Sequence, residues 1–257
     1  MAPIRPVDFE DRLTLVEHLD ELRSRLIICA IVFGVALALC FWQNHLLLDI
    51  ANKPLPGDIE PLTFGVAEPF TTTLTVSAYG AIILSMPVLI YELYAFVLPA
   101  LHPQEKKVAF PLMLMIPALF IAGVVFAYFI VVPAAIKFLL NFNNEQFNVE
   151  VRARDYYSFF SLTLVSVGAV FQVPVGILAA TRLGVVTPKQ LAQNRRYAYL
   201  VCAIAAMLLP GTDPVSMLIE MVPLILLFEL SLILARIFGP AHEPEGGARA
   251  APGEAPG

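Results

Sequence analysis

Charged side chains recur at helical spacing near the start of this sequence, where they can form ion pairs. Glu17, Glu21 and Arg25 follow one another at intervals of four residues, so they lie along one face of a helix. Glu21 and Arg25 can therefore pair across one turn of that helix. By itself the pattern is typical of a solvated charged face, and it leaves open whether a carboxylate here binds another molecule.

Polar side chains within apolar stretches form a second group of candidates, namely Gln172, Glu220 and Glu229. A carboxylate at the centre of a membrane costs about 2.5–3.5 kcal/mol to insert, so such side chains usually face a cavity or a partner. The amide of Gln172 can also clamp two helices through hydrogen bonds. Both interpretations remain open.

No catalytic constellation accompanies these residues. The four histidines lie outside the apolar stretches or at their ends, and the sequence has no HExxH motif and no glycine-rich phosphate loop. No pair of aspartates lies within an apolar stretch, which disfavours an intramembrane protease. We expect a protein without enzymatic activity, cofactor or metal.

Long apolar stretches must position these residues. A membrane-spanning helix needs about 20 apolar residues, and the sequence predicts six spans: Leu26 to Trp42, Leu74 to Leu98, Ala109 to Val132, Phe159 to Thr181, Tyr197 to Leu209 and Val215 to Ala235. The fifth is short, which requires local thinning of the bilayer or neighbours that shield its ends, unless the helix is one turn longer. An amphipathic helix at the membrane interface, from Asp8 to Leu26, is predicted to precede the first span.

Composition also indicates a membrane protein. Of the 257 residues, 58% are hydrophobic and 14% are charged, and the mean hydropathy is +0.77. Soluble domains average about 25% charged residues, so lipid must cover part of this surface. The net charge of −5 disfavours a nucleic-acid partner, which usually needs a basic face.

Lysines and arginines predict the orientation of the spans. With the N-terminus inside, twelve of the sixteen fall in inner segments and four in outer ones. Six spans would return the C-terminus to the inside. Trp42, Tyr156 and Tyr157 are then expected at the outer interface, and Tyr94 and Tyr197 at the inner one.

Prolines within or beside the spans predict kinked helices, and hence an all-α bundle that is curved and concave. We expect one membrane domain over residues 1–239, with residues 1–25 as its cytoplasmic amphipathic segment. Residues 240–257, rich in Pro, Gly and Ala, are expected to form a disordered cytoplasmic tail.

Seven segments resemble the TatC family of the twin-arginine, Sec-independent protein translocase, in the family's order and over about Thr14 to Gly239. They are EHLDELRSRL (17–26), MPVLIYELYAFVLPALHPQEKK (86–107), FAYFIVVPAAIKFL (126–139), FQVPV (171–175), NRRYAYL (194–200), LLPGTDPVSM (208–217) and LFELSLILAR (227–236). Each segment is weak alone, but seven in order on the expected topology are specific.

The resemblance implies a receptor subunit in the bacterial cytoplasmic (inner) membrane, multi-pass, with both termini cytoplasmic. Proteins of this family bind signal peptides with two consecutive arginines, carried by folded cargo proteins. Together with small single-span subunits of the TatA and TatB type, in an oligomeric complex within membrane lipid, they export the cargo, driven by the proton-motive force.

The resemblance also implies site residues. Glu21 and Glu105 match the glutamates that engage the two arginines. Arg23, Phe96 and Pro99 lie in the same motifs. A guanidinium pairs bidentately with a carboxylate, which a lysine cannot reproduce. Outer-loop residues of functional importance would be Pro54, Glu68 and Asp213.

Two positions depart from the family pattern. Gln172 stands where the family commonly has a glutamate. The glutamine side chain can still form hydrogen bonds, but it cannot carry a charge or exchange a proton. Pro210 and Met217 stand where some relatives carry polar residues, so docking of the small subunits is expected to differ there. The alternative function is an ion-coupled small-molecule transporter that uses the polar side chains at membrane depth, which a closed central cavity around them would favour.

Overall fold

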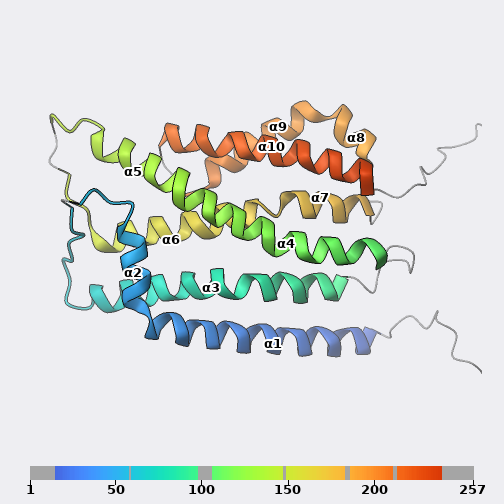
Figure 1. Ribbon diagram of the computed structural model, residues 1–257, viewed down its shortest axis with the longest axis horizontal. Helices are drawn as coiled ribbons and strands as arrows, with labels where there is room; N and C mark the ends of the chain where they lie inside the picture. The colour runs from blue at the N-terminus through green and yellow to red at the C-terminus, as the bar shows by residue number, and fades with distance from the viewer. Residues whose placement is uncertain are drawn as a thin grey trace, which may run out of the picture.

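Helices form the described architecture (Figure 1). The computed structural model describes residues 15–57, 59–97, 106–146, 149–182, 186–210 and 213–238. Within these ranges there is no strand, and one isolated bridge pairs Leu62 with Arg152. The prediction of an all-α chain is therefore confirmed for this part of the protein.

The elements follow one another as α1 Leu15–Trp42, α2 Asn44–Asn52, α3 Glu68–Val97, α4 Lys106–Phe126, the π-helix η3 Ala127–Val131, α5 Val132–Asn141, α6 Ala153–Val170, α7 Val173–Arg182, α8 Pro188–Gln193, α9 Arg195–Leu208 and α10 Pro214–Phe238. The long helices lie side by side in Figure 1. We call the end of the bundle where α1 begins and α3 stops the proximal end. The other end, where α1 stops and α2 lies, is the distal end.

α1 is one unbroken helix from Leu15 to Trp42, which corrects the expected division at Leu26. No proline or glycine lies between Leu15 and Gly34, and the charged turns are rich in Leu, Glu and Arg, which favour helix. These turns therefore extend the first span along its own axis (Figure 1) and do not form a separate interfacial helix. The first part of the predicted amphipathic helix, residues 8–14, lies outside the described residues.

Within the described ranges, five stretches are long and apolar enough to cross a membrane: Asp20–Trp42, Glu68–Leu93, Met115–Asn141, Ala153–Thr181 and Pro214–Ala235. They coincide with five of the six predicted spans. The remaining one corresponds to α9, which has 14 residues. At 1.5 Å per residue it extends about 21 Å, against a hydrocarbon core of about 30 Å. A sixth crossing therefore stays a prediction.

Two of the spans are built from consecutive helices. α4 passes through η3 into α5, whose first turn carries Pro133. α6 stops at Val170, and α7 begins at Val173 with Pro174 in its first turn. Because proline lacks an N–H group, it is best tolerated in the first turn of a helix. Both prolines were expected to disturb their spans, and they lie at these breaks.

Two glycines bring α4 and α6 into backbone contact. A Cβ atom on Gly123 would lie 2.7 Å from Cγ of Phe171 and 2.9 Å from Cα of Gly168. A Cβ atom on Gly168 would lie 2.8 Å from Cε2 of Phe120. No larger side chain fits between these helices, a form of packing that is common among membrane helices.

The largest buried cluster gathers residues of α2, α3, η3, α5 and α6. The Tyr156 hydroxyl donates to the carbonyl of Ala51, and the Tyr157 hydroxyl donates to Oδ1 of Asn52 at 2.8 Å. Both partners lie in the last turn of α2, where carbonyls lack intrahelical partners. Both tyrosines are thus buried under α2, and their position at a membrane interface stays a prediction.

Candidate functional site

Arg25 joins two carboxylates from different helices at the proximal end. Its Nε and Nη2 donate to Oε1 of Glu21, at 3.0 and 2.6 Å, and its Nη1 donates to Oε2 of Glu92, at 2.8 Å. Glu21 lies one turn before Arg25 on α1, and Glu92 lies near the end of α3. The predicted pairing of Glu21 with Arg25 is confirmed, and Glu92 extends it to a second helix.

These three residues, called the proximal trio below, carry one positive and two negative charges. Their side chains are partly buried, with exposed fractions of 23% for Arg25, 26% for Glu21 and 13% for Glu92. The guanidinium is planar and has five N–H donors, so it serves both carboxylates at once. An ammonium group, as a compact point charge, does not offer this geometry.

Of the four other residues predicted for this end, two lie within the described part of the chain. Arg23 is exposed and lies two residues from Glu21, hence on a different face of α1. Phe96 lies one turn beyond Glu92 on α3 and is half-buried. Pro99 and Glu105 lie outside the described residues. Glu92 was not predicted as a site residue, although its charge near the end of an apolar span was a signal for it.

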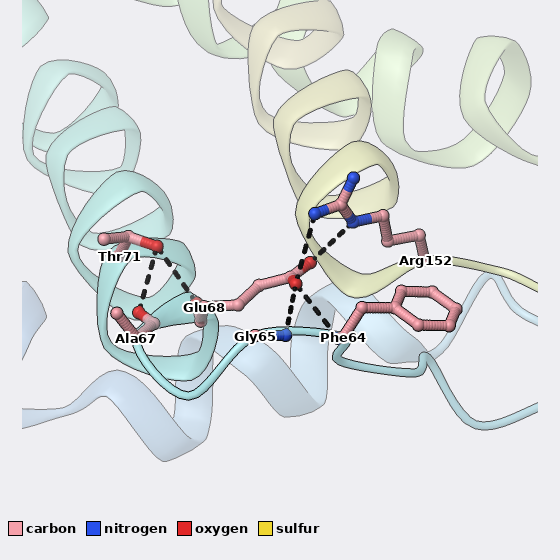
Figure 2. A network of polar contacts seen from close by, with 6 residues as sticks. All are labelled: Phe64, Gly65, Ala67, Glu68, Thr71 and Arg152. Atoms are coloured by element: carbon pink, nitrogen blue, oxygen red, sulfur yellow. Dashed lines mark hydrogen bonds and ion pairs between the residues drawn. The ribbon is translucent and has the colours of Figure 1, made fainter.

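Glu68 opens α3 at the distal end, and both of its carboxylate oxygens accept hydrogen bonds (Figure 2). Arg152 donates from Nε to Oε1 at 2.8 Å and from Nη2 to Oε2 at 3.2 Å. The backbone N–H groups of Phe64 and Gly65 also donate to Oε2, at 3.0 and 3.2 Å. The Glu68 side chain is 5% exposed, so this carboxylate is buried and has four donors.

The Glu68–Arg152 pair fastens the segment before α3 to the segment before α6. Leu62 reinforces this connection, because its N–H donates to the carbonyl of Val151 and its carbonyl accepts from the N–H of Ala153, both at 2.8 Å. The hydrogen bonds to Glu68 raise the pKa of Arg152 above its usual value. Glu68 was predicted as an outer-loop residue, but it is the first residue of a helix. Pro54, predicted with it, is half-buried just after α2.

Gln172 lies at the break between α6 and α7 and reaches across to α4. Its Nε2 donates to the carbonyl of Ile116 at 3.2 Å. Its Oε1 is buried and has no hydrogen-bond partner among the described residues. The amide therefore links two helices, which favours the clamp interpretation of this side chain.

Asp213, Ser216 and Glu220 form a buried polar face at the start of α10. Oδ1 of Asp213 accepts from the N–H of Ser216 at 2.8 Å, so Asp213, which directly precedes α10, caps that helix. The three residues are 3%, 0% and 2% exposed. Asp213 Oδ2, Ser216 Oγ and Glu220 Oε1 are buried and lack hydrogen-bond partners within the described part of the chain. Such groups are costly to bury.

Glu229 on α10 is bound by two side chains of α9. The hydroxyl of Tyr199 donates to its Oε1 at 2.6 Å, and Nη2 of Arg195 lies 3.1 Å from its Oε2. This carboxylate thus has a cation and a neutral donor. By contrast, Oε1 of Glu220, nine residues earlier on α10, has no hydrogen-bond partner among the described residues. Of the acids predicted within apolar spans, Glu229 holds α9 and α10 together.

Residues 17–223 match the family described as Sec-independent protein translocase protein (TatC). The Sec-independent protein translocase protein TatC of Desulforapulum autotrophicum is 35% identical over 234 residues, covering 90% of this chain and 87% of the relative. That of Escherichia coli K12 is 34% identical over 233 residues, covering 89% and 90%.

Two crystal structures of the twin-arginine translocase receptor TatC have the same fold. The first has a TM-score of 0.72 and 32% identity, and the match covers 86% of this chain and 99% of that one. The second, in DDM, has a TM-score of 0.75 and 33% identity, with 85% and 99% covered.

Proposed function

This chain belongs to the TatC family of Sec-independent protein translocase proteins, and we propose that it is the receptor subunit that binds twin-arginine signal peptides. Family membership and the apolar helices make it a multi-pass inner-membrane protein of protein transport. The two related crystal structures are those of a twin-arginine translocase receptor. We extend it to this chain on the basis of the chemistry at the proximal end.

The proposed topology has six spans with both termini in the cytoplasm, α9 being the short fifth span. The proximal end then faces the cytoplasm. The distribution of lysine and arginine supports this orientation, with twelve in inner and four in outer segments. Residues 1–239 form the membrane domain, curved around a concave face, and residues 240–257 form a dispensable cytoplasmic tail.

The proximal trio is the observation that carries the proposal. Glu21, the residue matched to the twin-arginine site, binds a guanidinium of its own chain at 2.6 Å. The guanidinium of a peptide arginine can form the same charge-assisted hydrogen bonds. Glu105 would take the second arginine, and Arg23, Phe96 and Pro99 would surround the site.

Ion pairs alone do not account for tight binding. A partly exposed pair contributes about 0.2–1 kcal/mol, so the hydrophobic part of the signal peptide must supply the remaining affinity along apolar helix surfaces. Small single-span subunits of the TatA and TatB type assemble with this chain, and the proton-motive force drives export of the folded cargo. The chain itself catalyses no reaction.

The test is binding of a fluorescent twin-arginine signal peptide to the purified, detergent-solubilised protein. The matched ligand is the same peptide with both arginines changed to lysine, which keeps the charge and removes the fork. We expect the lysine peptide to bind at least about tenfold more weakly, because the bidentate geometry of the guanidinium is lost at two positions. Equal binding of the two peptides would refute the proposal.

The second candidate, an ion-coupled small-molecule transporter, is favoured by the buried polar face of Asp213, Ser216 and Glu220. Proteoliposomes that contain the protein would distinguish the two functions. Solute uptake that is lost in Glu220→Gln, together with equal binding of the two peptides, would favour the transporter. Absence of uptake with discrimination between the peptides would favour the receptor.

A further inference from the structure

Glu92 is the least exposed member of the proximal trio. Its side chain is 13% exposed, whereas that of Glu21 is 26% exposed. A carboxylate in this environment is costly unless a cation accompanies it. Arg25 supplies that cation from another helix, although its short-range partner Glu21 lies one turn away on its own helix.

We propose that Glu92 and Glu21 together bind one arginine of the signal peptide, and that Arg25 occupies this position until the peptide displaces it. The inference rests on the proposed function, because it requires that an arginine-bearing peptide binds at the proximal end. It makes Glu92 a specificity-determining residue and Arg25 an internal competitor.

The fit of a guanidinium to this position is visible in the structure. The Nε and Nη2 atoms of Arg25 donate hydrogen bonds to Oε1 of Glu21, and its Nη1 donates one to Oε2 of Glu92. All three distances lie between 2.6 and 3.0 Å. The side chain of a peptide arginine ends in the same planar group with the same donors. A lysine can approach one of the two carboxylates, but its compact ammonium group cannot donate to both from one planar group as a guanidinium does.

Exchange of one arginine for another is feasible for two reasons. The trio holds two carboxylates and one guanidinium, so replacing Arg25 by a peptide arginine leaves the charge at the two carboxylates unchanged. Arg25 is also 23% exposed and has a long, flexible side chain, so it can turn toward solvent when displaced. A fully buried pair could not release its partner in this way without leaving a charge unpaired.

Peptide binding to single-residue variants tests the inference. The informative variants are Arg25→Gln, which removes the competitor, Glu92→Gln, which removes the second carboxylate, and the double variant. Arg25→Lys is a further variant that keeps the charge. Lys189→Gln is the matched control, because Lys189 is exposed on α8 and its loss changes the net charge by the same amount.

We expect Arg25→Gln to bind the twin-arginine peptide roughly two- to fivefold more tightly, the range for release of one partly exposed ion pair. Glu92→Gln should bind it roughly five- to tenfold more weakly, because the peptide guanidinium loses an ion pair and keeps only a hydrogen bond to a neutral amide oxygen. The double variant should lose the gain of Arg25→Gln. Arg25→Lys should lie between wild type and Arg25→Gln, and Lys189→Gln should match wild type.

Equal or weaker binding by Arg25→Gln would overturn the inference, since Arg25 would then orient the carboxylates and not compete for them. Wild-type binding by Glu92→Gln would overturn it as well. The amount of folded protein is checked by size-exclusion chromatography, and Arg25→Lys serves as the readout if Arg25→Gln does not fold. Failure of the proposed function looks different, because wild type itself would then bind the arginine and lysine peptides equally.

Discussion

The two ends of the bundle use glutamate and arginine in different proportions. At the distal end, Arg152 and two backbone N–H groups saturate a single carboxylate, that of Glu68. At the proximal end, two carboxylates share the single guanidinium of Arg25. The distal acid is 5% exposed, whereas the proximal Glu21 is 26% exposed.

The difference separates a structural connection from a binding site. A buried carboxylate with four donors gains little from another ligand, and loss of the Arg152 side chain would remove the donor to Oε1. A partly exposed guanidinium that bridges two carboxylates can be replaced by another guanidinium, which would bind the same oxygens. The same two residue types therefore hold the fold at one end and can exchange a partner at the other.

The largest expected effect falls on the proximal end. We expect Glu21→Ala, and likewise Glu105→Ala, to abolish export of a twin-arginine reporter protein in cells, because the arginines lose a carboxylate. Abundance in the membrane, measured by immunoblot, should stay at the wild-type level. Normal export by both variants would show that the binding site lies elsewhere.

Next in size is the effect of Glu68→Gln at the distal end. An amide has one acceptor oxygen and cannot serve Arg152 and both N–H groups, so the thermal unfolding midpoint should fall by several degrees. Binding of the signal peptide by the folded fraction should not change. Glu60→Gln, an exposed acid in the same connecting segment, is the control. An unchanged midpoint in Glu68→Gln would remove the contrast between the two ends.

Ionic strength should distinguish the two ends as well, with a smaller effect than the substitutions above. Raising the ionic strength from 0.1 to 0.5 M shortens the Debye length from about 10 Å to about 4 Å, and partly exposed charges are screened most. Peptide binding should weaken several-fold, whereas the thermal unfolding midpoint should move little. Arg152 is 41% exposed, but the Glu68 carboxylate is 5% exposed and is also held by two backbone N–H groups. A midpoint that falls in parallel with binding would contradict the assignment of Glu68–Arg152 as a structural connection.

The smallest expected effect is that of Tyr157→Phe in the distal core. The variant loses the hydrogen bond to Asn52 and should reduce the free energy of unfolding by about 0.5–1.5 kcal/mol, measured by denaturant titration in detergent. Tyr91→Phe is the control, because Tyr91 is 49% exposed on α3. If Tyr157→Phe lowered the free energy of unfolding as much as Glu68→Gln does in the same titration, the tyrosines, and not the ion pair, would stabilise the distal end.

Sequence reasoning found the features that depend on neighbouring residues. Five apolar stretches and the Glu21–Arg25 pair follow from local composition and from helical spacing, and both are confirmed. The link from Arg25 to Glu92 joins residues 67 positions apart, and that from Arg152 to Glu68 joins residues 84 positions apart. Such contacts depend on which helices pack together, and periodicity carries no information about that.

The errors have similar causes. The charged turns from Leu15 to Arg25 were assigned to an interfacial helix because their composition differs from that of the span, yet nothing in the chain interrupts the helix there. The burial of Tyr156 and Tyr157 was missed, because their residue type indicated only a membrane interface. α2, whose place in the fold could not be inferred from its nine residues, covers them.

The glycine contact between α4 and α6 has a mechanical consequence. Gly168 lies 16 residues along the chain from Arg152, a lever arm of about 24 Å. A side chain at Gly168 would push α6 away from α4, tilt the helix about that point and carry its first turn sideways. The guanidinium of Arg152 must stay within hydrogen-bonding distance of Glu68. A methyl group added at Gly168, deep in the bundle, would therefore lengthen the Arg152–Glu68 ion pair at the distal end.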